Sequence, residues 1–300
     1  MRALVTGASG FVGRHLITAL RDAGDESFSP AFDVTDGAAI RDALDATRPT
    51  HVFHLAAQTF VPDSLASPEA TYRTNVIGTA RVAQAIREYA QTNGTMPRLI
   101  FTSSAEIYGP REAREFPLRE SLDPRPANPY AASKAAAEAL LLGEARSLKL
   151  DVVVARAFNH IGPGQSDRFV VPSFASQLAR IARGAPPVLL VGNLEAARDF
   201  LDVRDVVRAY VSLARDGERS GIYNVCSGNA VTIRDVLREL VTIAHVPVEI
   251  REDPARMRPS DVPLLVGSAE KLRERTGWEP EIMLGRSLGD VYEAAYAVAS

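Results

Sequence analysis

Three glycines follow directly after an apolar segment near the amino terminus, in the stretch Ala3-Leu4-Val5-Thr6-Gly7-Ala8-Ser9-Gly10-Phe11-Val12-Gly13. The apolar residues predict a short buried strand, and Leu16, Ile17 and Leu20 beyond the glycines predict a helix. Glycines spaced G-x-x-G-x-x-G permit a tight turn and let backbone amides approach a pyrophosphate at the positive N-terminus of that helix. Strand, turn and helix together predict a dinucleotide-binding unit. The residues that we expect at the cofactor are Gly7, Ser9, Gly10, Phe11, Val12 and Gly13.

Apolar strands and helical segments alternate through the first half of the chain. Strands are expected at residues 51–55, 98–101 and 151–156, with a long helix over 69–91 and another that opens at Tyr130. A repeated β-α-β alternation implies a parallel sheet that is covered by helices on both faces. We therefore predict an α/β protein with a Rossmann-type doubly wound parallel sheet.

The segment between the first helix and Asp36 is short for a Rossmann unit. Such units carry a second strand that ends in a residue reading the 2′ position of the cofactor. Asp33 lies twenty residues after Gly13, so spacing alone would let it hold a ribose hydroxyl and favour NAD. The alternative, which we favour, is a stunted second strand, with Asp33 ending the following strand and touching the adenine edge. The choice between NADH and NADPH therefore stays open.

Small and hydroxyl-bearing residues stand where two of the predicted strands end. Ala56 and Ala57 follow the strand at 51–55 and leave room for a cofactor in the crevice where open α/β sheets bind ligands. Ser103 and Ser104 follow the next strand and reach the same edge. His54, within its strand, is interpreted as a packed residue rather than a catalyst.

Tyr130 and Lys134 are four residues apart at the start of a predicted helix. This spacing places the phenol and the ammonium on one helix face, about one turn apart. A positive Lys134 beside Tyr130 is expected to lower the tyrosine pKa from its reference of about 10. Tyr130 is then a proton donor or acceptor for chemistry near neutral pH.

Beyond Phe158 the alternation breaks down, which predicts a second, smaller α/β lobe interleaved with the first. We assign residues 1–158 to an NAD(P)-binding domain, to which 199–226 return, and residues 159–300 to a substrate-binding lobe. Residues 159–165 are expected to form a loop. The segment 253–263 is basic and rich in proline, and is suited to gripping an anion.

Composition and net charge disfavour several classes of protein. The net charge of −3 and the pI near 6.0 give no electrostatic footprint for nucleic acid. Cys226 is the single cysteine, so neither an intrachain disulfide nor a cysteine-rich metal site is expected, and a reducing cytosol is favoured. No apolar run approaches the roughly 18 residues that a membrane span needs. The expectation is a soluble cytoplasmic protein without a bound metal.

Six features in order along the chain resemble the extended short-chain dehydrogenase/reductase family of nucleotide-sugar enzymes. The resemblance covers essentially the whole chain, and it is carried by Gly7-x-x-Gly10-x-x-Gly13, Asp33-Val34, His54-Leu55-Ala56-Ala57, Ser103-Ser104, Tyr130-x-x-x-Lys134 and Gly162-Pro163. It implies that Ser104 hydrogen-bonds the reacting sugar oxygen and that Tyr130 transfers the proton. It also implies that Lys134 binds the nicotinamide ribose. Further cofactor contacts are then expected from Asp33, Val34, Leu55, Ala56, Ala57 and Phe158.

Four further segments resemble members of the family that reduce GDP-linked keto sugars. They are Phe158-Asn159-His160-Ile161-Gly162-Pro163-Gly164-Gln165, Gly192-Asn193-Leu194-Glu195 with Arg198-Asp199-Phe200, Tyr223-Asn224-Val225-Cys226-Ser227-Gly228 and Arg256-Met257-Arg258-Pro259-Ser260-Asp261. The resemblance implies that Arg198 and Arg258 clamp the substrate diphosphate, that Asp261 faces the guanosine and that Asn159 faces the sugar. The implied reaction is the reduction by NADPH or NADH of the C4 ketone of GDP-4-keto-6-deoxy-D-mannose to GDP-D-rhamnose.

Glu106 supports an alternative within the same family. Dehydratases that resemble this chain have a glutamate at the matching place, as the base that abstracts the C5 proton of the sugar. The residue before it is Ala105 here, where dehydratases commonly have Asp or Ser. We favour a substrate-hydroxyl contact or a local structural role for Glu106, and keep a dehydratase or epimerase with retained NAD as the second hypothesis. A catalytically silent nucleotide sensor is disfavoured, because Ser104, Tyr130 and Lys134 are all present.

A homodimer is the predicted assembly. Ala131, Ala135, Ala139 and Leu142 form a stripe of mostly small residues on the Tyr130 helix, which permits close approach of another helix. The family resemblance implies that this helix pairs with the one at 69–91 in a four-helix interface. Packing within a single chain is the simpler explanation of the same stripe.

Overall fold

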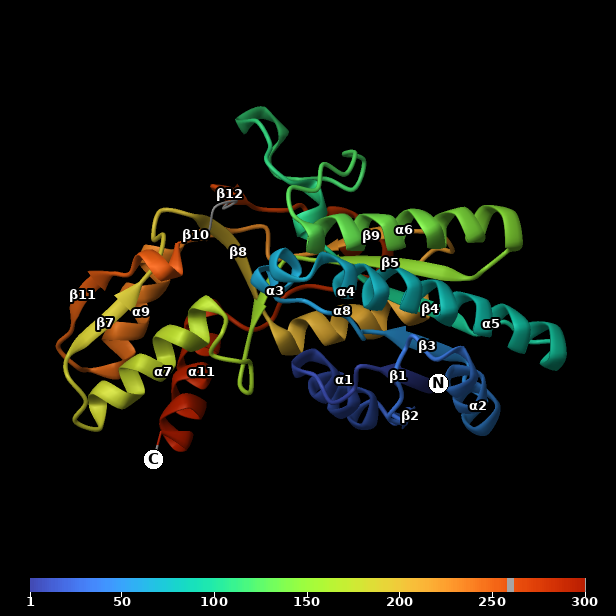
Figure 1. Cartoon of the computed structure of the whole chain (residues 1–300), viewed down its shortest axis with the longest axis horizontal. Coiled ribbons are helices and arrows are strands. Elements are labelled where there is room, and N and C mark those ends of the chain that lie inside the picture. Colours follow the sequence, from blue (N-terminus) through green and yellow to red (C-terminus); the bar gives the residue numbers. More distant parts are fainter. Residues whose placement is uncertain (258–261, 300) are drawn as a thin grey trace.

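A parallel sheet of six strands forms the centre of the computed structural model, which describes residues 1–257 and 262–299 (Figure 1). Every neighbouring pair of its strands is parallel. In spatial order the strands are β2 (Glu26–Phe28), β1 (Arg2–Thr6), β3 (His51–His54), β4 (Arg98–Ser104), β5 (Val152–Ala157) and β9 (Ile222–Val225). The predicted α/β fold with a Rossmann-type doubly wound sheet is thus confirmed.

Helices cover both faces of this sheet, and Figure 1 shows α5 and α6 on one side of the strands and α1 and α8 on the other. One layer contains α1 (Phe11–Asp22), α8 (Val203–Asp216) and α10 (Glu270–Thr276); the other contains α2 (Gly37–Thr47), α5 (Thr79–Asn93) and α6 (Pro129–Leu148). An apolar core lies on each face of the sheet, and strand β5 contributes side chains to both. Val153 and Ala155 face the first layer of helices, while Val152 and Val154 face the second. Alternation of side chains along a strand makes this possible.

The second strand of the Rossmann unit is stunted, as predicted. Strand β2 has only three residues and forms the edge of the sheet. The expectation that Asp33 ends a following strand is wrong, because residues 29–33 form no helix or strand and α2 begins at Gly37. Asp33 instead closes a turn in which its Oδ1 accepts hydrogen bonds from Thr35 N (2.8 Å) and Thr35 Oγ1 (2.9 Å).

A smaller lobe lies beside the sheet, at the left of Figure 1. Its strand β8 (Ala197–Asp202) pairs with three others, and a separate pair of strands lies outside it. The partners of β8 are β6 (Asn159–Ile161), β10 (Ala230–Thr232) and β12 (Leu264–Leu265), and the separate pair is β7 (Val188–Val191) with β11 (Glu249–Glu252). Helices α7 (Val170–Ala182), α9 (Ile233–Ala244) and α11 (Leu284–Val298) surround a third apolar core.

Strand β6 corrects one expectation. Residues 159–161 were expected to lie in a loop, but their backbone pairs in parallel with Phe200–Asp202 of β8. A partner so distant along the chain leaves no local pattern in a three-residue strand.

Short helical segments complete the fold. They are α3 (Val61–Ala66), α4 (Pro68–Tyr72), the π-helical η1 (Arg73–Gly78) and the 3₁₀ turns η2 (Ala105–Tyr108), η3 (Ala113–Glu115) and η4 (Pro254–Arg256). The helix expected at 69–91 is therefore a continuous series of α4, η1 and α5. Within 1–257 and 262–299, none of the helices has the length and apolar character needed to cross a membrane.

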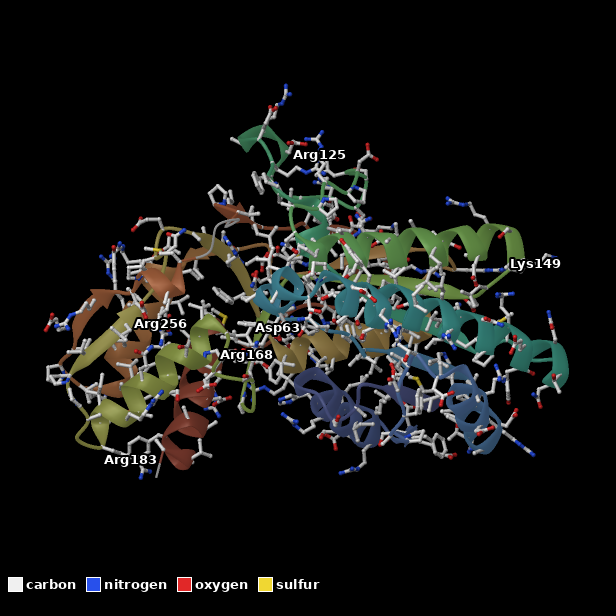
Figure 2. All side chains as sticks on the ribbon, viewed as in Figure 1. Asp63, Arg125, Lys149, Arg168, Arg183 and Arg256 are labelled. Atoms are coloured by element: carbon white, nitrogen blue, oxygen red, sulfur yellow. The ribbon has the colours of Figure 1, made fainter. Side chains whose placement is uncertain are left out.

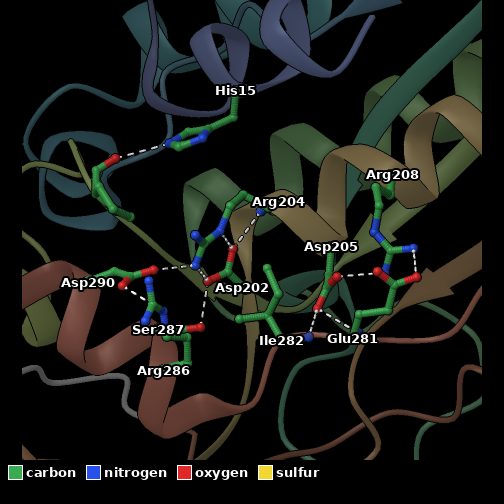
Figure 3. Close-up of polar contacts among 11 residues, drawn as sticks. His15, Asp202, Arg204, Asp205, Arg208, Glu281, Ile282, Arg286, Ser287 and Asp290 are labelled. Carbon is green, nitrogen blue, oxygen red and sulfur yellow. Dashed lines mark hydrogen bonds and ion pairs between the residues drawn. The ribbon is translucent and has the colours of Figure 1, made fainter. Parts of the chain in front are cut away.

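Two buried aspartates fasten the C-terminal segment to α8 (Figure 3). Asp202 caps α8 by accepting a hydrogen bond from Arg204 N (2.8 Å), and it also accepts one from Ser287 Oγ (2.6 Å) on α11. Asp205 accepts hydrogen bonds from the backbone N of Glu281 (3.1 Å) and Ile282 (2.9 Å). The smaller lobe is thereby attached to the helix that covers the larger sheet.

Candidate active site

The glycine turn after β1 packs directly against the end of β3. Gly7 has φ +72°, and a Cβ placed on it would lie 2.7 Å from Ala56 N. A Cβ on Gly13 would lie 2.4 Å from Gly7 O. Gly10 caps α1 without a side-chain hydrogen bond, so a positive helix N-terminus stands at the carboxyl end of the sheet. Only glycine fits at Gly7 and Gly13, and the backbone amides at the N-terminus of α1 suit the pyrophosphate of a dinucleotide.

Three other residues expected at the cofactor differ in burial: Val34 and Phe158 are buried, whereas Asp33 is exposed. Val34 is buried, and a Cβ on Gly78 would lie 2.8 Å from its Cγ2. Asp33 is exposed, and hydrogen bonds from Thr35 lower its carboxyl pKa. Phe158 is 3% exposed, and its ring packs in the core against Tyr108, with 6.3 Å between ring centroids. Phe158 is therefore a residue of the apolar core, and its contact with the cofactor stays a prediction.

Ser104, Tyr130 and Lys134 come together where β4 ends and α6 begins. Asn128 caps α6 by accepting a hydrogen bond from Ala131 N (2.8 Å), which fixes the first turn that carries Tyr130. Ser104 is a hydrogen-bond partner of Tyr130. Lys134 Nζ donates to Thr102 O (2.7 Å). All three predicted side chains are buried in this one place.

Burial governs the pKa values of these groups. Loss of water lowers the pKa of Lys134 to about 7. Burial raises the pKa of Tyr130 to about 12, although the Ser104 hydrogen bond lowers it, and the charge of Glu106 adds to the rise. The expected lowering of the tyrosine pKa by Lys134 is therefore wrong: burial is the largest influence on Tyr130, and it raises the pKa. Tyr130 remains protonated, as a proton donor, at neutral pH.

Glu106 lies beside this group in η2. Its backbone N donates to Ser104 Oγ (3.2 Å), and its Oε2 accepts a hydrogen bond from Asn128 Nδ2 (3.3 Å). Both Glu106 and Asn128 line the cavity described below. Sequence patterns did not single out Asn128, whose position just before Pro129 and Tyr130 was the available signal for a helix cap.

A buried polar network supports the site from behind. Glu138, one turn after Lys134, accepts a hydrogen bond from Ser103 Oγ (2.9 Å) and forms an ion pair with Arg156 of β5. Arg156 Nη1 donates to Tyr108 Oη (2.9 Å), which in turn donates to Asn224 Oδ1 (2.7 Å). These bonds tie α6 to β4, β5 and β9. Ser103 therefore has a structural hydrogen bond at the strand end, while Ser104 faces Tyr130.

His54 is a packed residue, as interpreted from the sequence. Its ring lies between Thr6 Oγ1 (2.8 Å) and Thr79 Oγ1 (3.0 Å) and links β1, β3 and α5. Burial, followed by the positive charge of Lys134, lowers its pKa to about 3. The ring is neutral at physiological pH and serves as a structural bridge.

A cavity of about 490 Å³ runs between the two lobes. Its walls include Glu106 and Asn128 from the larger lobe, and Asn159, Arg198 and Arg256 from the smaller. The volume falls within the range of small-molecule sites. Three arginines line it, Arg168, Arg198 and Arg256, and they suit a negatively charged ligand.

The predicted substrate residues are distributed as follows. Asn159 begins β6 and Arg198 lies in β8, where its Nη1 donates to Ala197 O (2.9 Å) and 9% of the residue is exposed. Arg256 Nη1 donates to Ser173 Oγ (3.0 Å) across the cavity. Arg258 and Asp261, expected at the diphosphate and the guanosine, lie outside the described residues. In the part of the chain that is described, no cluster of three or more His, Cys, Asp or Glu side chains could hold a metal.

Known proteins resemble the chain over nearly its full length. A family model described as GDP-mannose 4,6 dehydratase matches residues 28–290. GDP-6-deoxy-D-mannose reductase of Pseudomonas aeruginosa is 42% identical over 96% of this chain and 94% of its own. GDP-6-deoxy-D-talose 4-dehydrogenase of Aggregatibacter actinomycetemcomitans is 31% identical over 91% of this chain and 90% of its own.

Solved structures give the same result. RMD of Pseudomonas aeruginosa, complexed with NADPH, superposes with a TM-score of 0.91 at 38% identity and covers 99% of both chains. UDP-glucose 4-epimerase of Thermus thermophilus, complexed with NAD, has a TM-score of 0.88 at 31% identity and covers 99% of this chain and 100% of its own. With the family model spanning most of its residues, the chain belongs to the GDP-mannose 4,6-dehydratase family, within the extended short-chain dehydrogenase/reductases that its motifs predicted.

Proposed function

We propose that the chain uses NADPH or NADH to reduce the C4 ketone of GDP-4-keto-6-deoxy-D-mannose, giving GDP-D-rhamnose. The observation that carries this proposal is the 42% identity, over nearly the whole of both chains, with a GDP-6-deoxy-D-mannose reductase. The buried group of Ser104, Tyr130 and Lys134 supports it, because a carbonyl reduction needs a proton donor and a site that excludes water.

Each side chain of this group has a distinct proposed role. When bound, a reduced nicotinamide would supply the hydride that the carbonyl carbon accepts. Tyr130, protonated at neutral pH, gives its phenolic proton to the carbonyl oxygen as negative charge develops there. Ser104 donates a hydrogen bond to the same oxygen. The charge of Lys134 favours the phenolate that Tyr130 becomes after it has given up its proton.

We further propose that the two lobes bind different ligands. Residues 1–158 bind the cofactor, and residues 159–300 bind the nucleotide sugar. Of the segment 199–226, assigned to the first domain, α8 and β9 lie with the large sheet, whereas residues 199–202 lie in β8 of the smaller lobe. Asn159 would contact the sugar, while Arg198 and Arg258 would hold the diphosphate and Asp261 the guanosine. The position of Asn159 and Arg198 in one cavity with Glu106 supports this assignment.

A dehydratase is the second candidate, because Glu106 lies in the cavity next to Asn128 and can reach a substrate there. The two activities differ in their use of cofactor. The test is the absorbance of reduced nicotinamide when purified protein is mixed with GDP-4-keto-6-deoxymannose or with GDP-mannose. A reductase oxidises one cofactor per keto sugar and leaves GDP-mannose unchanged. Formation of a keto sugar from GDP-mannose without net oxidation would identify a dehydratase.

A homodimer in the cytoplasm is also proposed. Ala131 of the predicted stripe packs inside the chain, but Ala139 is exposed and Ala135 and Leu142 are half-buried on the outer face of α6. Ile77, 49% exposed, adds an apolar side chain from the neighbouring helical series. A monomeric mass by light scattering at micromolar concentration would overturn the dimer.

A further inference from the structure

Two segments from different lobes meet beside the cavity through a charged and an aromatic contact. Arg168, two residues before α7, forms an ion pair with Asp63 of α3 at 2.5 Å. Its guanidinium also lies 3.9 Å from the centroid of the Phe60 ring. Phe60 in turn packs edge to face with Phe169, with 5.5 Å between centroids. Figure 2 shows Asp63 and Arg168 side by side between the lobes. We call Asp63, Arg168 and Phe60 the clasp.

The clasp is attached to the catalytic helix. Ser64, next to Asp63, is fully buried, and its hydroxyl accepts a hydrogen bond from Tyr130 N (3.2 Å) and donates one to Val61 O (2.7 Å). Helix α3 is therefore fixed to the first turn of α6. On the other side, Phe169 is the N-cap of α7, which packs into the core of the smaller lobe. The clasp thus connects the helix that carries Tyr130 directly to the smaller lobe.

The clasp also borders the proposed substrate site. Phe60, Arg168 and Phe169 line the same cavity as Glu106 and Asn128, both of which lie beside the catalytic group. These side chains form part of the cavity wall, and α3, which carries Asp63, is hydrogen-bonded to Tyr130 through Ser64.

The contacts of the clasp are weak, as is expected of an element that opens and closes. The side chains of Arg168 and Asp63 are 50% and 48% exposed, and half-exposed ion pairs contribute little free energy. A cation–π contact at an exposed site adds a similarly small amount. Closure of such elements sequesters substrate, and their opening often limits product release.

We propose that the clasp retains the sugar of a bound nucleotide sugar and must open to admit and release it. Asp63, Arg168 and Phe60 act as positioning residues that hold the smaller lobe closed over the reacting end of the ligand. The identity of that ligand rests on the proposed function. Arginine is required rather than lysine, because one planar group makes both the ion pair and the contact with the ring.

The clasp is tested with Arg168→Gln and Asp63→Asn. The matched control is Arg183→Gln, at the other end of α7, where Arg183 lies 4.5 Å from the Tyr296 ring centroid and donates to Tyr296 O (2.7 Å), away from the cavity (Figure 2). Stopped-flow displacement gives the dissociation rates of GDP-mannose and of GDP for each protein. Arg168→Gln loses both contacts and should release GDP-mannose about three- to tenfold faster. Asp63→Asn should have a smaller effect, and the control none.

Two comparisons distinguish a loss of sugar retention from a general loss of structure. GDP has no sugar, so its dissociation rate should be the same in all variants. Exchange of the charges, Asp63→Arg with Arg168→Asp, should restore part of the slow release of GDP-mannose. Equal release of GDP-mannose by wild type and Arg168→Gln would overturn the clasp, as would a wild type that holds GDP-mannose no longer than GDP. Slow release without reduction of the keto sugar would overturn the proposed function and leave the clasp supported.

Discussion

Burial sets the protonation states of the two proposed catalytic side chains on α6. Tyr130 and Lys134 are 9% and 4% exposed, and desolvation moves the pKa of Tyr130 up and that of Lys134 down. Near neutral pH the tyrosine therefore holds its proton, whereas the lysine is balanced between its two forms. This is a suitable starting state for a reduction, in which Tyr130 has to give a proton away.

Replacement of Tyr130 by phenylalanine removes the proposed proton donor and leaves the ring in place. The turnover number for the keto sugar should fall by about 10²–10⁴-fold, the usual contribution of a positioned acid. Steady-state kinetics measures the effect, and an unchanged thermal unfolding temperature confirms that the fold survives. Retention of wild-type turnover would mean that another group supplies the proton.

Burial of Lys134 should lower the stability of the folded protein near neutral pH. A lysine whose pKa is about 7 when folded and 10.5 when unfolded binds fewer protons in the folded state between these pH values. Stability therefore rises with pH through this window, and the cost is greatest at and below about pH 7. Lys134→Met should raise the thermal unfolding temperature near neutral pH, with a gain that shrinks toward pH 10.5. Lys149→Met, at the exposed end of the same helix, should show no such trend.

Helix α8 shows how single elements hold the two lobes in place. Asp202 is 2% exposed at its N-terminus, and Arg204 bridges it to Asp290 of α11 (2.7 Å; Figure 3). Burial alone would raise the pKa of Asp202, but hydrogen bonds from Arg204 and Ser287 outweigh burial and lower it. The charged form of Asp202 therefore stabilises the native state.

Asp202→Asn removes this charge while it keeps a side chain that can cap the helix. The free energy of unfolding should fall by about 1–3 kcal/mol at neutral pH, the contribution of hydrogen bonds to a charged group. Because the folded pKa lies below 3.8, the difference is fully present above that value and is lost as pH falls through the folded pKa. Urea unfolding of both proteins at neutral and acid pH measures it. Asp216→Asn, exposed on the same helix, should have no effect; an equal loss there would contradict the account.

Elements with a strong local pattern could be predicted from the sequence, and those defined by distant partners could not. The glycine turn before α1 and the apolar run of β5 were located correctly. Strand β6 was missed because its partner, β8, lies some forty residues away along the chain. The chain length after Asp25 indicated a stunted second strand, but only the coordinates place Asp33 in a turn.

At the scale of the whole molecule, the sequence indicated which chemical groups the site contains but not how the lobes are held together. Tyr130 and Lys134 were found from their spacing, and Ser104 from the family resemblance. The clasp joins residues 105 positions apart and leaves no local trace in the sequence. The Glu138–Arg156 ion pair was not predicted either. A charged residue in each of two buried elements was nevertheless a signal that the two residues contact each other.

The central claim is net reduction of the sugar, and the fate of one hydrogen tests it most directly. Purified protein is given GDP-4-keto-6-deoxymannose with a reduced cofactor carrying deuterium at both C4 positions of the nicotinamide, and the product is analysed by mass spectrometry. The account predicts a GDP-deoxyhexose that carries one deuterium at C4 of the sugar for each cofactor oxidised. Unchanged keto sugar and cofactor, together with formation of the keto sugar from GDP-mannose, would contradict it and make Glu106 the base of a dehydratase.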